Sequence, residues 1–132
     1  MNAKKELKNK LQKPFLIATT YQGDNGDSVI FDSFKEELQT IYKVTKISGV
    51  WEGVKERSLI IQDSMGRNFE NLIPRFFNEF NQDAVIYSIG KRIELVSPSS
   101  FETLVENKFN KPFKEGEGKF GYSIYKGFKF HF

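Results

Sequence analysis

Short β-prone runs separated by turn sequences recur through the middle of the chain, and they restrict its fold more than any other feature. Each run is rich in β-branched, aromatic or other apolar residues, which favour strands. The runs are 41–47, 58–63, 84–89 and 93–96. With 132 residues, 39% of them hydrophobic, the chain is long enough to bury these strands in one domain. We therefore expect a mainly β fold.

The segment from Phe69 to Phe80 admits two interpretations. Its apolar residues recur at helical spacing, but Pro74 lies inside the pattern, and a proline inside a helix costs about 3 kcal/mol. Dividing the segment removes this conflict. A third strand then covers 67–73, and Pro74 begins a helix that ends near Gln82. We prefer the divided interpretation.

The N-terminal third predicts two further strands and a short helix. We expect a strand over 15–21 and a turn at Asn25-Gly26, because Asn-Gly accepts the positive φ of a hairpin reversal. A returning strand over 29–31 and a helical turn over 33–39 follow.

Other turn and capping sequences divide the rest of the chain. Gly49 permits a bulge, and 51–56 is expected to be a polar connection. Ser99, with Glu102 three residues later, forms a capping box that predicts a helix through Phe109. Alternating apolar residues predict one last strand over 121–132.

The chain has no Cys and a single His, which excludes several kinds of functional site. Disulfides, Cys-ligated zinc, iron–sulfur clusters and thiol catalysis all require Cys, and a His-pair metal site requires a second His. No Ser–His–Asp triad can be assembled around the penultimate residue, and no Gly-rich phosphate loop is present. We therefore expect no catalytic residues, no metal ligands and no cofactor.

Positive charge is concentrated at the two ends of the sequence. Residues 1–13 carry five lysines and one glutamate, and 105–132 carry six lysines and three glutamates. Residues 14–104 hold nine Lys or Arg against thirteen Asp or Glu, so the net charge of +3 conceals a mildly acidic middle. Basic ends predict contact with a polyanion, and a merely solubilising tail is the alternative. The lysines of this basic N-terminal arm are Lys4, Lys5, Lys8, Lys10 and Lys13. Residues 2–12 are expected to form either a short Lys-rich helix or a disordered arm.

The order of the expected elements resembles that of the OB-fold family. Residues 41–96 are expected to give strand, strand, strand, helix, strand and strand, and the second strand leads into Asp63-Ser64-Met65-Gly66. Residues 58–67 and 76–80 resemble the strand–turn–strand and helix of single-strand-binding modules of the replication protein A type. The resemblance implies an α+β fold, a five-stranded Greek-key barrel at about 41–96 with extra terminal strands and two short helices. One domain would then span 14–132, including the helix and strand over 99–132.

The resemblance also implies a groove for single-stranded nucleic acid on the middle strands and their loops. The matching residues are Lys43, Lys46, Trp51, Arg57, Arg67, Phe69, Tyr87, Lys91 and Arg92. Trp51 carries the strongest expectation because a polar, Gly-containing loop is an unusual place for a core residue. For Phe69 and Tyr87, packing in the core is the competing interpretation.

We therefore expect a non-enzymatic, cytoplasmic protein that binds single-stranded DNA largely without sequence preference, with RNA and duplex DNA as other nucleic-acid partners. No apolar stretch is long enough for a signal peptide or a spanning helix, so no membrane contact is expected. The arm over 1–13 would add phosphate contacts or give self-association along the DNA. The Lys-rich composition suits a plasmid or phage origin. The alternative function is a protein-interaction or inhibitor module on an OB-like or mixed α/β fold.

Overall fold

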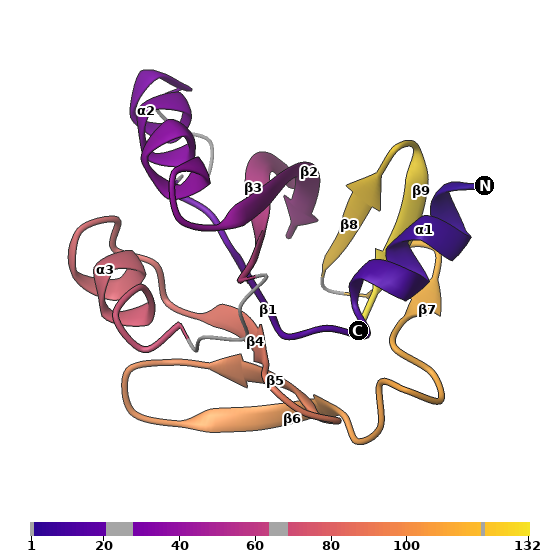
Figure 1. Cartoon of the computed structure of the whole chain (residues 1–132). Coiled ribbons are helices and arrows are strands. Elements are labelled where there is room, and N and C mark those ends of the chain that lie inside the picture. Colours follow the sequence, from indigo (N-terminus) through magenta and orange to yellow (C-terminus); the bar gives the residue numbers. More distant parts are fainter. Residues whose placement is uncertain (1, 21–27, 64–68, 120) are drawn as a thin grey trace.

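The computed structural model describes residues 2–20, 28–63, 69–119 and 121–132, which form a mainly β fold (Figure 1). Three helices lie within these ranges: α1 (Ala3–Lys10), α2 (Ser28–Gln39) and α3 (Ile73–Asn78). The nine strands described are β1 (Phe15–Ala18), β2 (Lys43–Trp51), β3 (Val54–Gln62), β4 (Val85–Ser88), β5 (Ile93–Val96), β6 (Phe101–Val105), β7 (Lys114–Glu115), β8 (Gly121–Tyr125) and β9 (Phe128–His131). The predicted α+β class is confirmed, although the helix expected from Ser99 does not form and α1 is present in addition to α2 and α3.

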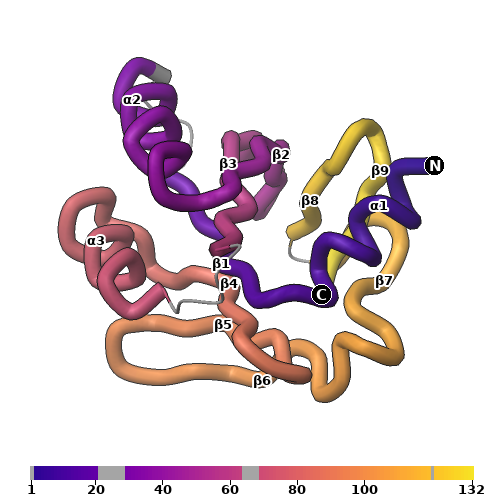
Figure 2. Tube along the Cα trace, viewed as in Figure 1, coloured from indigo at the N-terminus to yellow at the C-terminus, as the bar shows by residue number. Residues whose placement is uncertain are grey.

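All nine strands belong to one antiparallel sheet in the order β6-β5-β4-β1-β3-β2-β8-β9-β7. The sheet curls into a half-barrel, with β5 and β6 at one end and β8, β9 and β7 at the other (Figures 1 and 2). β1 lies near the centre, where Leu16 opposes Ile61 of β3 and Tyr87 of β4. The expectation that this strand only extends the barrel from outside is wrong, because β1 has a partner along each edge and is buried throughout.

Each face of the curled sheet has its own hydrophobic core, because successive strand residues point to opposite faces. α2 and α3 cover one face, and α1 covers the other (Figure 1). The core under α2 and α3 contains Leu16, Ala18, Phe31, Phe34, Leu38, Leu59, Ile61, Phe69, Leu72, Phe76 and Val85. The core under α1 contains Leu7, Leu11, Phe15, Ile17, Ile47, Ile60, Ile93, Phe113, Tyr125 and Phe130.

β2 and β3 form a long hairpin joined by a two-residue turn at Glu52-Gly53. Both turn residues have positive φ, 50° and 83°, as a type I′ turn requires. The register runs unbroken from Lys43–Gln62 to Trp51–Val54, so no bulge forms at Gly49. The expected polar connection over 51–56 is therefore wrong, because most of this segment belongs to the paired ends of two strands.

Two expected strands are helical or irregular in the structure. The expected strand over 29–31 belongs to α2, because only a helix places Phe31, Phe34 and Leu38 on one buried face. The strand expected over 67–73 is wrong in its described part, where 70–72 form a turn and α3 begins at Ile73. Pro74 lies in the first turn of α3, which confirms the expected helix start to within one residue.

The region after residue 96 differs most from its expected structure. The segment predicted as a helix from Ser99 contains β6, which pairs with β5 through a turn that the Ser97 N–H closes by donating to the Ser100 carbonyl at 2.8 Å. The single strand expected over 121–132 is the β8–β9 hairpin, whose turn at Lys126-Gly127 has positive φ at both residues. The turns expected at Asn25-Gly26 and after Asp63 lie outside the described residues.

Candidate nucleic-acid interface

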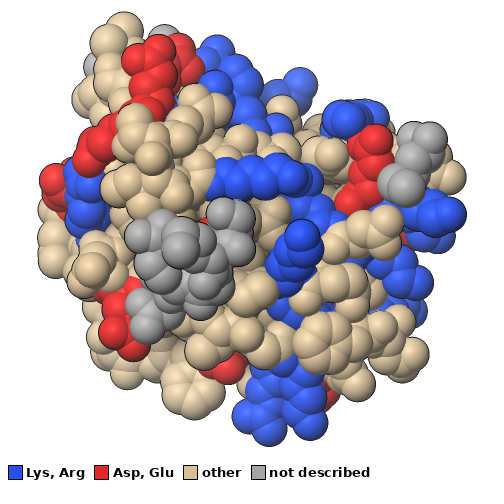
Figure 3. Space-filling model, in the orientation of Figure 1, with Lys and Arg blue, Asp and Glu red and all other residues tan. Residues whose placement is uncertain are grey.

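A hollow of about 430 Å³ lies where the end of α1 meets the β2–β3 hairpin and the β8–β9 turn. We call it the lysine pocket, because four of its nine lining residues are lysines from three separate parts of the chain. Its lining residues are Glu6, Asn9, Lys10, Lys13, Lys43, Gln62, Asp63, Tyr125 and Lys126. In the view of Figure 3, Lys and Arg side chains spread over the middle and right of the molecule, whereas acidic side chains are more frequent on the left, over α2 and α3, with a further group on the right.

Packing of α1 fixes the pocket's first wall. The Asn2 side chain caps the helix by accepting from the Lys5 N–H at 2.9 Å, and Leu7 and Leu11 are fully buried against the sheet. The Gln62 side-chain amide donates to the Lys10 carbonyl at 2.8 Å, which joins the end of α1 to the end of β3. Lys43 opposes Gln62 in the β2–β3 register, so its position follows from the same contact.

The electrostatics of the pocket leave positive charge uncompensated. Burial lowers the pKa of Lys10, and the nearby charges of Lys43 and Lys126 lower it further. Glu6 accepts from Lys126 at 2.9 Å and from the Tyr125 hydroxyl at 3.3 Å, and its pKa is lowered mainly by the Lys126 hydrogen bond. With four lysines and two carboxylates, Glu6 and Asp63, the lining has a net charge of +2. Such a lining attracts anions.

Lys108 connects the pocket to the next basic segment. Its side chain is 1% exposed, and burial lowers its pKa to about 8. The ammonium donates to the Lys13 carbonyl at 2.9 Å, and the Lys108 backbone N–H donates to the Lys91 carbonyl at 2.7 Å. Lys108 therefore contacts the backbone of both Lys13 in the pocket and Lys91 in the β4–β5 turn.

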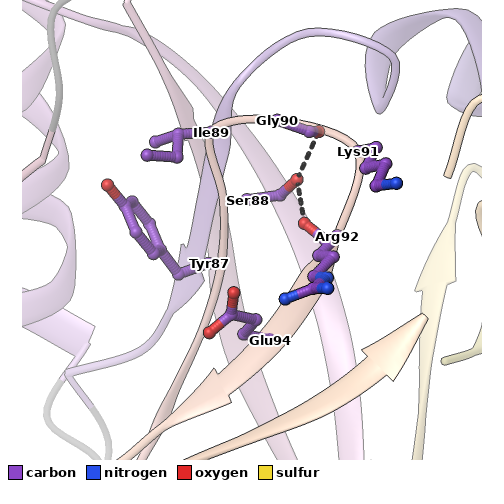
Figure 4. A pocket seen from close by; sticks show the side chains of 7 residues that line it. All are labelled: Tyr87, Ser88, Ile89, Gly90, Lys91, Arg92 and Glu94. Carbon is purple, nitrogen blue, oxygen red and sulfur yellow. Dashed lines mark hydrogen bonds between the residues drawn. The ribbon is translucent and has the colours of Figure 1, made fainter. Parts of the chain in front are cut away.

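The β4–β5 turn borders a second hollow, of about 280 Å³ (Figure 4). The Ser88 hydroxyl, with carbonyl partners at 2.7 Å on Arg92 and 3.3 Å on Gly90, tightens this turn. Lys91 and Arg92 are both exposed here, and Arg92 lies 3.5 Å from Glu106. The pKa of Tyr87, which lines the same hollow, is raised mainly by burial. The turn adds two cations to the basic surface but no enclosed anion site.

The structure divides the residues that sequence reasoning placed in one groove. Lys43 lies on the α1 side of β2, on the same strand face as Ile47, whereas Lys46 shares its face with Val44 on the opposite side. Arg57 also lies on the side of α2, 3.9 Å from Asp32 and 6.0 Å from the Phe31 ring. Lys43 and Lys46 therefore lie on opposite faces of β2 and do not share one groove on a single face of the sheet.

The expected aromatic residues are also separated. Trp51 is 56% exposed at the hairpin tip, where its ring lies over Gly121, and it is about 26 Å from Lys43 along β2 at 3.3 Å per residue. Phe69 is fully buried and packs against Tyr42 and Tyr87, as the competing core interpretation expects. Arg67 lies outside the described residues.

The N-terminal lysines have different environments. Lys10 and Lys13 line the pocket, and Lys4 forms an ion pair with Glu115 of β7. Lys5 and Lys8 are exposed on α1. The segment expected as an arm is therefore a helix packed on its own domain.

Two residues that the sequence reading did not select belong to this surface. Lys126 follows β8 and lines the pocket, and Phe109 is 55% exposed beside Lys108. The turn at Lys126-Gly127, where both residues have positive φ, was missed because one continuous strand was expected over 121–132. Phe109 is the last residue of the helix predicted from Ser99, which does not form.

Within the described ranges, no three His, Asp or Glu side chains are grouped closely enough to hold a metal ion. No helix in the described part of the chain is long and apolar enough to cross a membrane. No family model matches the sequence, and no curated protein is significantly similar to it.

Proposed function

We propose that this protein binds single-stranded DNA through the lysine pocket and performs no chemistry on it. The observation that supports this function is the convergence of four lysines on one hollow with a net positive lining. Like charges repel each other in the free protein. Phosphate oxygens would relieve that repulsion and accept charge-assisted hydrogen bonds from the amines. The pocket's chemistry therefore favours a phosphate-bearing partner.

The continuation of the basic surface favours a polymer over a small anion. Lys108 holds Lys13 of the pocket beside Lys91, and Arg92 follows on the same turn. Binding of single strands requires such a cationic path along the backbone, together with exposed rings for the bases. The proposal rests on this path and not on a five-stranded Greek-key barrel, which was the basis of the expected OB-like groove.

Self-association through the N-terminal segment stays a prediction. Leu7 and Leu11, the apolar residues of α1, are buried within the chain. A subunit contact through this segment would therefore use its exposed polar face, including Lys5 and Lys8.

The proposed function is tested by titrating labelled oligo-dT and the matching duplex at two salt concentrations. We expect tighter binding of the single strand and a steep loss of affinity with salt, with a slope of about 0.7 in log K for each phosphate contact. Trp51→Ala should weaken only oligomers long enough to reach from the pocket to the hairpin tip. Absence of binding at low salt would overturn the proposal.

A second candidate function, binding of a protein partner, has one specific observation in its favour. β6 is the terminal strand of the described sheet, and Phe101 on it is 68% exposed. An extended peptide could add to such an edge and cover this ring. Failure of oligo-dT binding would make this edge the next surface to test.

A further inference from the structure

Phe109 presents an aromatic ring to solvent in a fixed position. It lies in the turn between β6 and β7 and is 55% exposed, although most rings of this protein are packed in its two cores. The Phe109 N–H donates to the Asn107 side-chain oxygen at 3.1 Å, and the Lys111 N–H donates to the Asn107 carbonyl at 3.2 Å. The backbone that carries the ring is therefore held by its own turn.

The ring also rests on a buried cation. The Lys108 ammonium lies 5.7 Å from the centre of the Phe109 ring and 5.1 Å from that of Phe15. An ammonium over an aromatic face is attracted by the ring's quadrupole, and the attraction is stronger where water is excluded. This contact fixes the ring further and leaves its exposed part available for a ligand.

The same lysine places Phe109 beside the lysine pocket. The Lys108 ammonium donates to the Lys13 carbonyl, and the Gln12 side-chain amide donates to the Lys108 carbonyl at 3.0 Å. The Lys108 backbone N–H reaches Lys91 on the other side. The ring thus lies beside the one residue that contacts both Lys13 of the pocket and Lys91 of the β4–β5 turn.

We propose that Phe109 is the residue on which an unpaired base stacks when the adjacent phosphates occupy the lysine pocket. This inference rests on the proposed function and names the chemical feature that would make the site selective. Bases in a duplex are already stacked and paired, so an exposed ring beside a phosphate site favours single strands. The ring tolerates any base, because every base offers a π-face.

The proposal is tested with the full chain and three ligands of equal length: oligo-dT, an abasic oligomer that has phosphates without bases, and duplex DNA. Phe109→Ala should weaken oligo-dT binding by about 5- to 150-fold and leave the affinities for the other two ligands unchanged. Phe109→Trp should keep the preference for oligo-dT over the abasic oligomer. Phe101→Ala is the matched control, because it removes another exposed phenylalanine ring, at the far end of β6, and should leave all three affinities unchanged.

The outcomes separate this proposal from the proposed function. If Phe109→Ala binds oligo-dT as tightly as Phe101→Ala does, the stacking role is wrong while single-strand binding stands. If Phe109→Ala weakens all three ligands equally, the ring acts through the fold or the charges and the stacking role is again wrong. If the wild-type chain binds none of the three, the proposed function and the stacking role both fail.

Discussion

Arg75 and Lys10, which lie on opposite faces of the sheet, have opposite surroundings. Arg75 on α3 lies 2.9 Å from Glu37 and 2.5 Å from Glu79, and these carboxylates raise its pKa, Glu79 most. Lys10 on α1 has two lysines among its neighbours, and burial and their charges lower its pKa. One cation is neutralised within the chain, whereas the other is crowded by like charges.

On this difference we base the proposal that the α1 face, and not the α2 and α3 face, binds the nucleic acid. Arg75 also lies 4.8 Å from the centre of the Phe34 ring, so it helps to hold α3 against α2. On the α1 side Lys4 and Lys126 also have carboxylate partners, but Lys10 lies among the charges of Lys43 and Lys126. That repulsion is a cost that a bound anion would offset. We therefore expect stability to depend on both faces but nucleic-acid binding on the α1 face alone.

Removing one buried leucine from each face should give the largest effects. Leu7→Ala and Leu38→Ala each create a cavity in one of the two cores, and each should lower the free energy of unfolding by about 2–5 kcal/mol. Only Leu7→Ala should also weaken oligo-dT binding, because it loosens the helix that carries Lys10. Chemical denaturation and binding titrations of the two variants measure this. Equal losses of oligo-dT affinity in both variants would contradict the expected difference between the two faces.

The buried Lys108 should give the next effect, a dependence of stability on pH. Its pKa is about 8 in the folded protein, against about 10.4 for an unfolded lysine, so between these values the unfolded chain binds more protons. Stability should therefore rise with pH over that range, relative to a Lys108→Met variant that lacks the titrating group. Denaturation of both proteins from pH 7 to 10 checks the difference. Parallel pH profiles for the two proteins would show that Lys108 is not held in a desolvated site.

Replacing Arg75 should have the smallest effect. Arg75→Met removes two partly exposed ion pairs and one contact with Phe34, which together contribute about 1 kcal/mol. We expect thermal denaturation to show this modest loss and oligo-dT affinity to change by less than about twofold, because Arg75 lies on the other face. A large loss of affinity would move the binding surface to α2 and α3.

The sequence predicts those elements whose local pattern matches their final environment. The runs 58–63, 84–89 and 93–96 became β3, β4 and β5, since short apolar runs between turn residues have few alternatives to a strand. Ser99 and Glu102 satisfy the capping-box pattern, yet pairing of β6 with β5 overrides it. Local patterns cannot weigh such a tertiary contact.

The sequence predicted less of the candidate site than of the fold. Lys43 was identified and lies in the pocket, but Lys46 was assigned to the same groove because strand alternation was not applied to the pair. Lys10 and Lys126 line the pocket together with Lys43 but are 33 and 83 residues away from it in sequence. Only the packing of α1 and of the β8–β9 turn brings these three lysines together.

The most direct test of the two-face account compares the salt dependence of oligo-dT binding for two double variants. Lys10→Gln with Lys43→Gln removes two cations from the lysine pocket, and Lys46→Gln with Arg57→Gln removes two from the opposite side of β2 and β3. We predict that the first pair weakens binding and lowers the slope of log K against log salt by about 1.4, since each lost contact removes about 0.7. The second pair should match the wild type. Equal losses for both pairs, or a loss confined to the second, would contradict the account.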